Sequence, residues 1–350
     1  MNKPVYRLMR FLTCILSVFI LFSCSNDSRK PDVSGIQADV KVQRFDKDFF
    51  SIDTNQLTTS LDTLYKKYPT FLPLYFEYLS PINFIVHQEG KSYSEAILTY
   101  YRNIKSLNDS VQKKFGDFSD YEKNLETGLR YVKYYFPSFR LPSVYTSVES
   151  LNPENKQEIY GTLYFRDTLV ISLQMFLGQN YSAYDPTLYY DYLRRRFEAP
   201  YIVPNSIRSI ANELYTDTSQ ESSLIEQMIE KGKQWYLLDH LLPDAPDSVI
   251  TFFTGRQLEW CNANEGNIWA AIQSTTPNLF TIEPERIQNY LGEAPFTPDL
   301  QPQSSPGNIG QWVGWKIVEK YADRNPKLSL QQVLSTPAMK IFQEAKYRPK

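Results

Sequence analysis

Histidine is scarce in this chain, which has 350 residues and only two histidines, His87 and His240. A zincin metalloprotease holds zinc through two histidines one helical turn apart in the pattern H-E-x-x-H, and the glutamate between them acts as the base. The two histidines here are far apart in the sequence, so zinc catalysis of that kind is excluded. We expect neither a metal nor another cofactor. We place His87 in a loop and His240 at the end of a helix, where it interacts with the helix dipole.

Cysteine is also scarce, since the chain contains only Cys14, Cys24 and Cys261. The first lies in an export signal and the second is the expected lipid attachment site, so no intramolecular disulfide can form. Cys261 follows a tryptophan in an aromatic-rich helical segment, where a free cysteine is usually a small buried apolar residue. The sequence also lacks a G-x-S-x-G motif, a P-loop and a dinucleotide-binding fingerprint. We therefore assign no catalytic residue.

Long apolar runs are absent except near the N-terminus. Residues 11–22 form an uncharged apolar stretch that is too short to span a membrane comfortably. This stretch follows three basic residues and ends in L-F-S-C, which is typical of a bacterial lipoprotein signal peptide. We therefore predict a signal peptide over 1–23, cleavage before Cys24, and lipidation of Cys24, which would anchor the chain to a membrane. The alternative is an uncleaved anchor with an incidental cysteine.

An excess of basic residues is also absent. The chain carries 37 Lys and Arg against 39 Asp and Glu, and removal of residues 1–23 takes away three basic residues, which leaves a net charge of 34 − 39 = −5. Nucleic acid is therefore not an expected partner. Residues 24–35 are polar and show no periodicity, which predicts a tether. Residues 36–350 are rich in apolar and aromatic side chains and are predicted to form a single domain.

The spacing of apolar residues changes along this domain. Alternation at every second residue, or a run of β-branched residues, predicts strands over 40–45, 143–149, 160–165 and 168–173. Arg166-Asp167 is predicted to form a tight turn between the last two strands. Helical periodicity predicts a helix that begins at Asp53, helices over 94–135 that are broken around 108–109 and 116–117, and further helices after Asp247 and over 257–271. The predicted fold class is α+β, predominantly helical with a small β-sheet.

The central stretch, residues 204–243, predicts two packed helices. The first helix carries N-E-L-Y-T, from Asn212 to Thr216, at the place where a zincin would carry H-E-x-x-H. Glu213 matches the glutamate of that pattern, but Asn212 and Thr216 are not a suitable pair of zinc ligands. We interpret these residues as a degenerate zincin motif without a metal.

Charged residues near this stretch admit more than one interpretation. Glu213 with Asp217, and Glu226 with Glu230, are one helical turn apart and could serve acid–base chemistry or bind Ca²⁺, but no calcium-loop pattern accompanies them. A solvated helix face explains them better. Residues 189–196 hold three tyrosines and three arginines. Such a segment can bind anions or nucleic acid, but we expect the tyrosines to pack and the arginines to pair with acids.

Residues 305–318 form a second distinctive stretch, S-P-G-N-I-G-Q-W-V-G-W-K-I-V. Ser305 can cap a helix in which Pro306 is the first residue. Gly310 and Gly314 are one turn apart, and each glycine costs a helix about 1 kcal/mol relative to alanine. We therefore expect these glycines to form a smooth face on which another helix packs closely.

Several segments can be read together, in order, along nearly the whole chain. They are the signal ending at Cys24, V-Q-R-F-D-K-D-F-F (42–50), K-Y-Y-F-P-S-F (133–139), I-S-L-Q-M-F-L-G (171–178), E-W-C-N-A-N-E-G-N-I-W (259–269), A-P-F-T (294–297) and the 305–318 stretch. This set resembles the gliding-motility lipoprotein GldB family of Bacteroidetes. The helix pair and the 305–318 stretch are also similar to predicted secreted zinc proteases that keep H-E-x-x-H. The resemblance implies a zincin-like fold that has lost its metal site.

The same resemblance implies a cell-envelope lipoprotein associated with gliding motility and its linked secretion machinery. We therefore expect a protein that is anchored to a membrane through lipid on Cys24, faces the periplasm, and serves without catalysis as a scaffold or partner of envelope proteins. Attachment to the inner and to the outer membrane both agree with the sequence. The alternative function is a peptidase-like envelope hydrolase with a site around Glu213.

Overall fold

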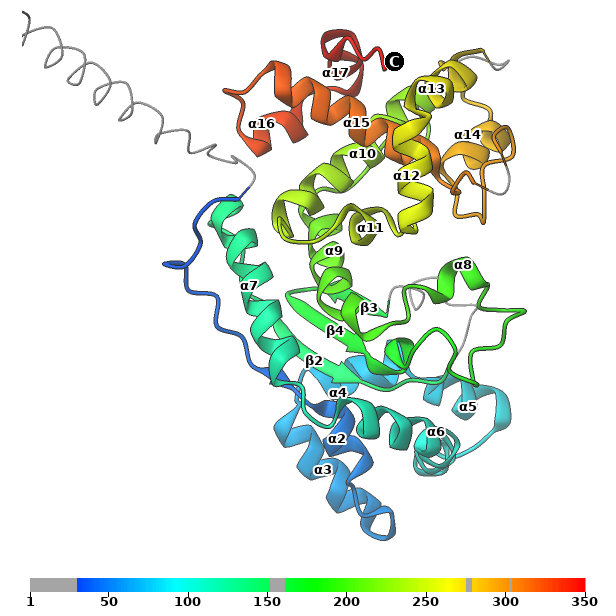
Figure 1. The fold of residues 1–350 in the computed structure, drawn as a ribbon. Helices are drawn as coiled ribbons and strands as arrows, with labels where there is room; N and C mark the ends of the chain where they lie inside the picture. Colours follow the sequence, from blue (N-terminus) through cyan, green and yellow to red (C-terminus); the bar gives the residue numbers. More distant parts are fainter. Residues whose placement is uncertain (1–29, 152–160, 275–278, 302–303, 350) are drawn as a thin grey trace, which may run out of the picture. The chain divides into compact units, whose positions relative to one another are not determined.

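The structure, a computed structural model, describes residues 30–151, 161–274, 279–301 and 304–349. The predicted signal peptide and Cys24 lie outside the described residues, so both stay predictions. Residues Ser34–Lys350 form one compact unit, and Met1–Val33 are a separate unit. The larger unit is mostly helical and contains a small sheet, which confirms the predicted α+β class (Figure 1).

The sheet has four strands in the order β1 (Val42–Gln43), β2 (Ser143–Ser147), β4 (Thr168–Ser172) and β3 (Thr162–Phe165). β2 pairs in parallel with both β1 and β4, whereas β3 pairs antiparallel with β4. Arg166 and Asp167 join β3 to β4 with φ angles of 48° and 57°. Positive φ at both residues is typical of the two-residue hairpin turns that match strand twist, so the predicted tight turn is confirmed.

The strand predicted over 40–45 is much shorter than expected, because only Val42–Gln43 pairs with β2. The N–H of Val42 donates to Oε2 of Glu122, at 2.6 Å, in helix α7 (Ser119–Tyr135). The chain then enters helix α2 at Phe45. Before β1, the N–H of Val40 donates to Oε1 of Glu126 at 3.3 Å, and after β1 the helix begins at Phe45, so neither end of the predicted strand pairs with β2.

The helices of the N-terminal half are α2 (Phe45–Phe50), α3 (Leu57–Lys67), α4 (Phe71–Leu74), the π-helix η2 (Tyr75–Leu79), α5 (Ile82–Glu89), α6 (Tyr93–Phe115) and α7. The predicted break around 108–109 is wrong, because α6 continues through it. Asn108 accepts a hydrogen bond from Gln112 at 2.9 Å, and Asp109 pairs with Lys105, so both residues are held by contacts one helical turn away. The predicted break at 116–117 is confirmed.

The two faces of the sheet are covered differently. Helix α9 (Ile202–Leu214) packs against β3 and β4 on one face (Figure 1). A cluster of buried aromatic rings lies against Tyr145 of β2 and Val170 of β4, and includes Phe45, Phe49, Tyr68, Phe71, Tyr75 and Tyr100. The rings of Phe71 and Tyr145 stack with centroids 4.1 Å apart. Each fully buried large apolar side chain contributes roughly 1.5–3 kcal/mol, so this cluster is a main source of stability.

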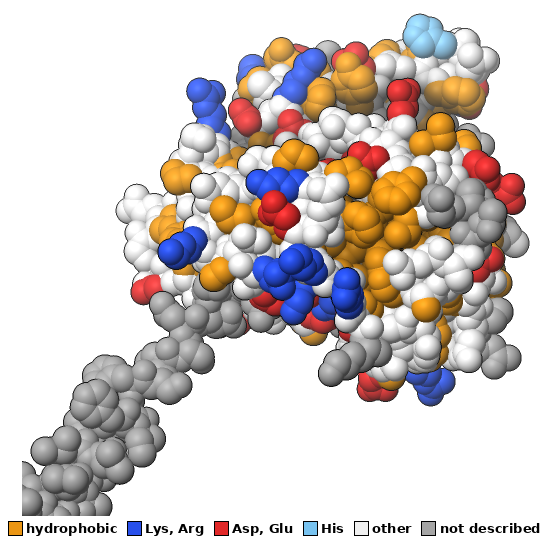
Figure 2. All heavy atoms as spheres, turned by 90° about the horizontal axis from the view of Figure 1, so that it is seen from above, with side chains coloured by type: hydrophobic (Ala, Val, Ile, Leu, Met, Phe, Trp, Pro, Cys, Tyr) orange, Lys and Arg blue, Asp and Glu red, His pale blue; other side chains and the backbone are white. Residues whose placement is uncertain are grey.

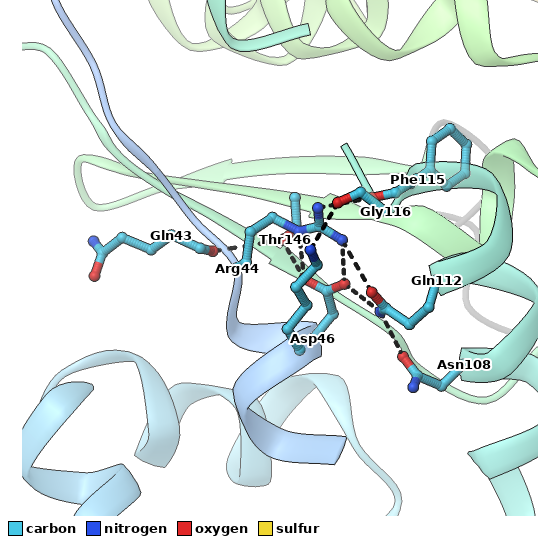
Figure 3. Close-up of polar contacts among 9 residues, drawn as sticks. Gln43, Arg44, Asp46, Asn108, Gln112, Phe115, Gly116 and Thr146 are labelled. Carbon is cyan, nitrogen blue, oxygen red and sulfur yellow. Dashed lines mark hydrogen bonds and ion pairs between the residues drawn. The ribbon is translucent and has the colours of Figure 1, made fainter. Parts of the chain in front are cut away.

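Asp46 ties the first helix to the rest of the domain (Figure 3). Its side chain is fully buried and makes a two-point ion pair with Arg44, at 2.9 and 2.7 Å. Thr146 of β2 and Gln112 of α6 donate to the same carboxylate at 2.5 and 2.7 Å. Arg44 also donates to the carbonyl of Phe115, which lies at the C-terminal end of α6. The R-F-D part of the 42–50 segment is therefore structural.

The helices of the C-terminal half are α8 (Asp191–Arg194), α9, α10 (Leu224–Leu241), α11 (Asp247–Thr251), α12 (Gly255–Ala263), α13 (Glu265–Ser274), α14 (Pro284–Leu291), α15 (Ile309–Arg324), α16 (Leu330–Ser335) and α17 (Ala338–Ala345). The single helix predicted over 257–271 is two helices. Asn264 separates them, and its side-chain amide donates to the carbonyl of Trp260.

Helix α10 is the centre of this half, and packs against α9, α15, α17, α7 and α11. Buried residues occur on all sides of it, as expected for a helix surrounded by others. The prediction that 204–243 contains two packed helices is confirmed, with α9 beginning two residues before the predicted start.

Glycines allow α10 and α15 to approach closely. A Cβ atom added to Gly314 would lie 1.7 Å from the carbonyl oxygen of Met228, and one added to Gly232 would lie 2.2 Å from the carbonyl carbon of Gly314. Gly310 faces a different neighbour, because its added Cβ would lie 3.0 Å from the carbonyl oxygen of Tyr290 in α14. The predicted close contact is confirmed, and Gly232 is the partner glycine that the sequence analysis missed.

The start of α15 differs from the prediction. The helix begins at Ile309, and Asn308 is its N-cap residue with a left-handed backbone (φ 45°). Ser305 does not cap it, because its hydroxyl accepts a hydrogen bond from the N–H of Thr297 at 3.4 Å.

Within the described ranges, no helix is both long and apolar enough to cross a membrane. Figure 2 shows apolar side chains gathered over part of the face seen from above, beside a group of basic side chains with acidic ones among them. A partner that covered this face would meet apolar and charged groups together.

Candidate functional site

A polar cavity of about 460 Å³ lies among α9, α10 and the start of α15. Its lining contains neither histidine nor cysteine, and consists of Arg208, Ala211, Asn212, Thr216, Asp217, Gln220, Lys231, Gln234, Trp235, Leu238, Phe252, Leu291, Glu293, Asn308 and Gln311. Asn212 and Thr216, the two positions of the degenerate zincin motif where histidines would stand, both line it. Glu213 does not.

Helical spacing explains how α9 and α10 present their side chains to the cavity. Arg208 and Asn212 are one turn apart on α9, as are Lys231 and Gln234 on α10. Thr216 follows the end of α9, where its hydroxyl contacts the carbonyl of Asn212. Residues 208–238 therefore supply most of the lining.

Asp217 and Lys231 form an ion pair at one wall of the cavity, with Nζ 2.9 Å from Oδ2. The other oxygen of Asp217 accepts hydrogen bonds from the N–H and hydroxyl of Ser219. Burial acts to raise the pKa of Asp217, but the hydrogen bonds from Ser219 and the charge of Lys231 outweigh it, so the pKa lies below its ordinary value. Asp217 is therefore a charged, paired group.

Phe252, another lining residue, lies close to two arginines, of which Arg208 also lines the cavity. The guanidinium carbons of Arg196 and Arg208 lie 4.2 and 4.3 Å from the ring centroid of Phe252, which is the range of cation–π contacts. Phe252 has a φ angle of 59°, which is uncommon for a bulky residue. Arg196 donates to Glu293 at 2.6 Å, and Arg208 donates to the carbonyl of Ile250 at 2.7 Å. These contacts fix this part of the lining in one arrangement.

The start of α15 contributes Asn308 and Gln311 to the lining of the cavity. Asn308 is 6% exposed, and its side chain makes no capping hydrogen bond. The side chain of Gln311 donates to the carbonyl of Leu291 at 2.7 Å. Asn308 and Gln311 therefore bring amide groups to the cavity from a part of the chain remote from α9.

Glu213 is exposed on α9, and its charge influences the pKa of Tyr164. Burial, together with the nearby carboxylates of Asp167 and Glu213, raises the pKa of Tyr164 to about 12. Among the described residues, no group of three or more His, Cys, Asp and Glu side chains could hold a metal ion. The polar lining of the cavity can thus bind a ligand through hydrogen bonds.

The acidic pairs singled out in the sequence do not form one solvated face. Helix α9 ends at Leu214, so Asp217 is not on the same helix as Glu213, and it is buried in its ion pair. Glu226 accepts from Ser223 in a capping box at the start of α10. Glu230 pairs with the buried Lys233 at 2.7 Å. The solvated interpretation is wrong for Asp217 and Glu230.

Other residues considered from the sequence lie away from the cavity. His240 is in the last turn of α10, as predicted, with Nδ1 2.8 Å from the carbonyl oxygen of Tyr236. His87 lies in α5, so its assignment to a loop is wrong. Cys261 is buried, which raises its pKa to about 12, as expected for a packed thiol.

The segment 189–196 confirms the structural interpretation in part. Tyr189 is buried, Arg194 pairs with Asp191, and Arg196 pairs with Glu293. Tyr190, in contrast, is 52% exposed. The contact from Arg196 to the cavity wall was not foreseen, because Glu293 follows it by 97 residues.

Comparison with known proteins identifies a family. The family model described as "Gliding motility protein GldB" matches residues 26–349, which includes the whole cavity and begins after Cys24. No curated protein and no solved structure matches the chain. The likeness to zincins therefore stays a prediction. The chain belongs to the family of the gliding motility protein GldB.

Proposed function

We propose that this chain is a non-catalytic, lipid-anchored protein of the cell envelope that binds other envelope proteins of the motility or secretion machinery. Family membership supports the association with gliding motility. Lipid on Cys24 would hold the protein at a membrane, with the domain facing the periplasm.

One observation carries the proposal that the protein binds rather than catalyses. The zincin-motif positions that line the cavity are an amide and a hydroxyl, Asn212 and Thr216, whereas Glu213 is not part of the lining. Amides and hydroxyls bind ligands through hydrogen bonds and are poor general bases. The cavity is a binding site in this account, and Glu213 has no part in it.

A crosslinking pulldown from native envelopes tests the proposal. Thr216→Trp would fill the cavity, so we expect the captured envelope proteins to be lost, whereas Glu213→Gln should retain them. Thr218→Trp is the matched control, because Thr218 is exposed and is not among the lining residues. Each variant is accepted only if its melting temperature equals that of the natural chain.

The hydrolase alternative makes the opposite prediction. If Glu213 is a catalytic base, purified full-length chain should cleave envelope peptides, and Glu213→Gln should abolish cleavage. That result, together with unchanged capture by Thr216→Trp, would refute the binding proposal.

A further inference from the structure

Three amide side chains face the cavity from three different elements: Asn212 on α9, Gln234 on α10 and Asn308 at the start of α15. Within the described ranges, no hydrogen bond occupies any of these three side chains. Asn308 is the most notable, because it is 94% buried yet its amide opens to the cavity. Because this amide is accessible from the cavity, a bound ligand that pairs with it would exchange a hydrogen bond to water for one to the protein.

The backbone of Asn308 adds to this observation. Its φ angle of 45° is left-handed, which asparagine tolerates better than most residues but which glycine adopts without strain. Glycine would therefore satisfy the backbone at this position. An asparagine that neither caps the helix nor pairs elsewhere contributes a donor and an acceptor to the cavity.

The charges around the cavity argue for an uncharged ligand. Its lining contains two cationic side chains, Arg208 and Lys231, and two anionic ones, Asp217 and Glu293, which sum to zero. Lys231 pairs with Asp217, and Glu293 pairs with Arg196. The lining therefore offers a charged ligand no net opposite charge, and a charge without a counterion in a buried site is costly.

The aromatic residues of the lining argue against a sugar. Trp235 and Phe252 are 5% and 7% exposed. Trp235 packs edge-on against Phe253 and Trp315, and Phe252 lies between its two arginines. Little of either ring is therefore accessible for a pyranose to stack on.

We propose that the cavity binds an uncharged segment of a partner polypeptide, and that the amides of Asn212, Gln234 and Asn308 pair with its peptide groups. A peptide group offers one N–H donor and one carbonyl acceptor, and each of these side-chain amides offers a carbonyl acceptor and an NH₂ group that can pair with them. A cavity of about 460 Å³ is within the roughly 300–1,000 Å³ typical of ligand sites, so it holds a short segment. This inference rests on the proposed function, for which it supplies the chemistry of recognition.

Isothermal titration calorimetry on the lipidated full chain in detergent tests the inference. The first probe is a mixture of N-acetylated, C-amidated tetrapeptides of Ala, Ser, Asn and Gln. The second is the same mixture with free C-terminal carboxylates, and the third is chitotriose. Asn308→Gly removes an amide while suiting the left-handed backbone, and Gln234→Ala removes another. Asn262→Ala is the control, because Asn262 is exposed on α12 and does not line the cavity.

The capped peptides should bind the natural chain and the control equally. Each cavity variant should bind them about tenfold more weakly, as expected for the loss of one hydrogen bond. Binding of chitotriose alone, binding of the carboxylate peptides alone, or no binding by a chain with an unchanged melting curve would each overturn the inference. Failure of the natural chain to capture any envelope protein in the pulldown would refute the proposed function as well. Retained capture with no peptide binding would refute only this inference.

Discussion

Asp46 and Asp217 are two buried carboxylates, and each is held by a different set of partners. Asp46 is held by Arg44, Thr146 and Gln112, which come from three separate segments. Neither its burial nor its partners could be predicted from the V-Q-R-F-D segment, because the contacts join residues that are up to 100 apart in the chain. The sequence pattern marked the segment as distinctive, and only the structure gives the reason.

Asp46→Ala should destabilise the domain by about 3 kcal/mol, because it leaves Arg44 without its buried counterion. Urea unfolding followed by circular dichroism measures the difference. Asp39→Ala is the control, since Asp39 is exposed, and it should change the free energy of unfolding by less than about 0.5 kcal/mol. Equal effects of the two substitutions would contradict the structural role of Asp46.

Asp217 should make stability depend on pH. Its folded-state pKa is lowered by Ser219 and Lys231 against the effect of burial, so the charged carboxylate stabilises the fold above the ordinary carboxyl pKa. That stabilisation is lost as the pH falls from about 4 through the lowered pKa. Asp217→Asn should therefore be less stable than the natural chain at pH 7, and the difference should shrink at pH 3. A difference that is constant between these pH values would contradict the ion pair.

At the scale of elements, the crossing of α10 and α15 shows what periodicity can predict and what it cannot. The sequence predicted a close helix contact at Gly314, because glycine in a helix needs a packing reason. It could not identify Gly232 as the partner, since a helix face carries no information about which other helix covers it. The break predicted in α6 is a second example. Asn108 and Asp109 remain in the helix because Gln112 and Lys105 make contacts with their side chains.

Gly314→Leu should lower the stability of the domain by about 3 kcal/mol or more, because even the first added carbon would overlap the backbone of Met228. Differential scanning calorimetry measures the shift in melting temperature. Gly255→Ala is a matched control in α12, where an added Cβ meets nothing within 4 Å. A Gly314→Leu chain that melts like the control would show that the two helices do not cross at these glycines.

At the scale of the whole molecule, the sequence predicted the α+β class, the helix pair and the family, which are set by local periodicity and by ordered segments. It could not assemble the cavity. Glu293 and Asn308 reach the cavity from positions 79 and 94 residues beyond the end of α9 at Leu214, and their role depends on how α14 and α15 pack. The single-domain boundary at residue 36 and the anchor at Cys24 stay predictions.

Removal of the lipid site should release the protein from membranes. Cys24→Ala should abolish incorporation of radiolabelled palmitate and move the chain to the soluble fraction, because a lipid attached to Cys24 is the anchor in this account. The thermal unfolding of the released chain should be unchanged. Continued labelling and membrane fractionation of the variant would refute the lipoprotein signal.

The central claim is that the cavity face of α9 contacts a partner and that Glu213 does not take part. A photo-crosslinking amino acid placed at Asn212 or at Glu213, in cells that make the full chain, tests this directly, since the two residues are adjacent but only Asn212 lines the cavity. We predict a crosslinked envelope protein from position 212 and none from position 213. Crosslinking from 213 alone, or from neither position, would contradict the account.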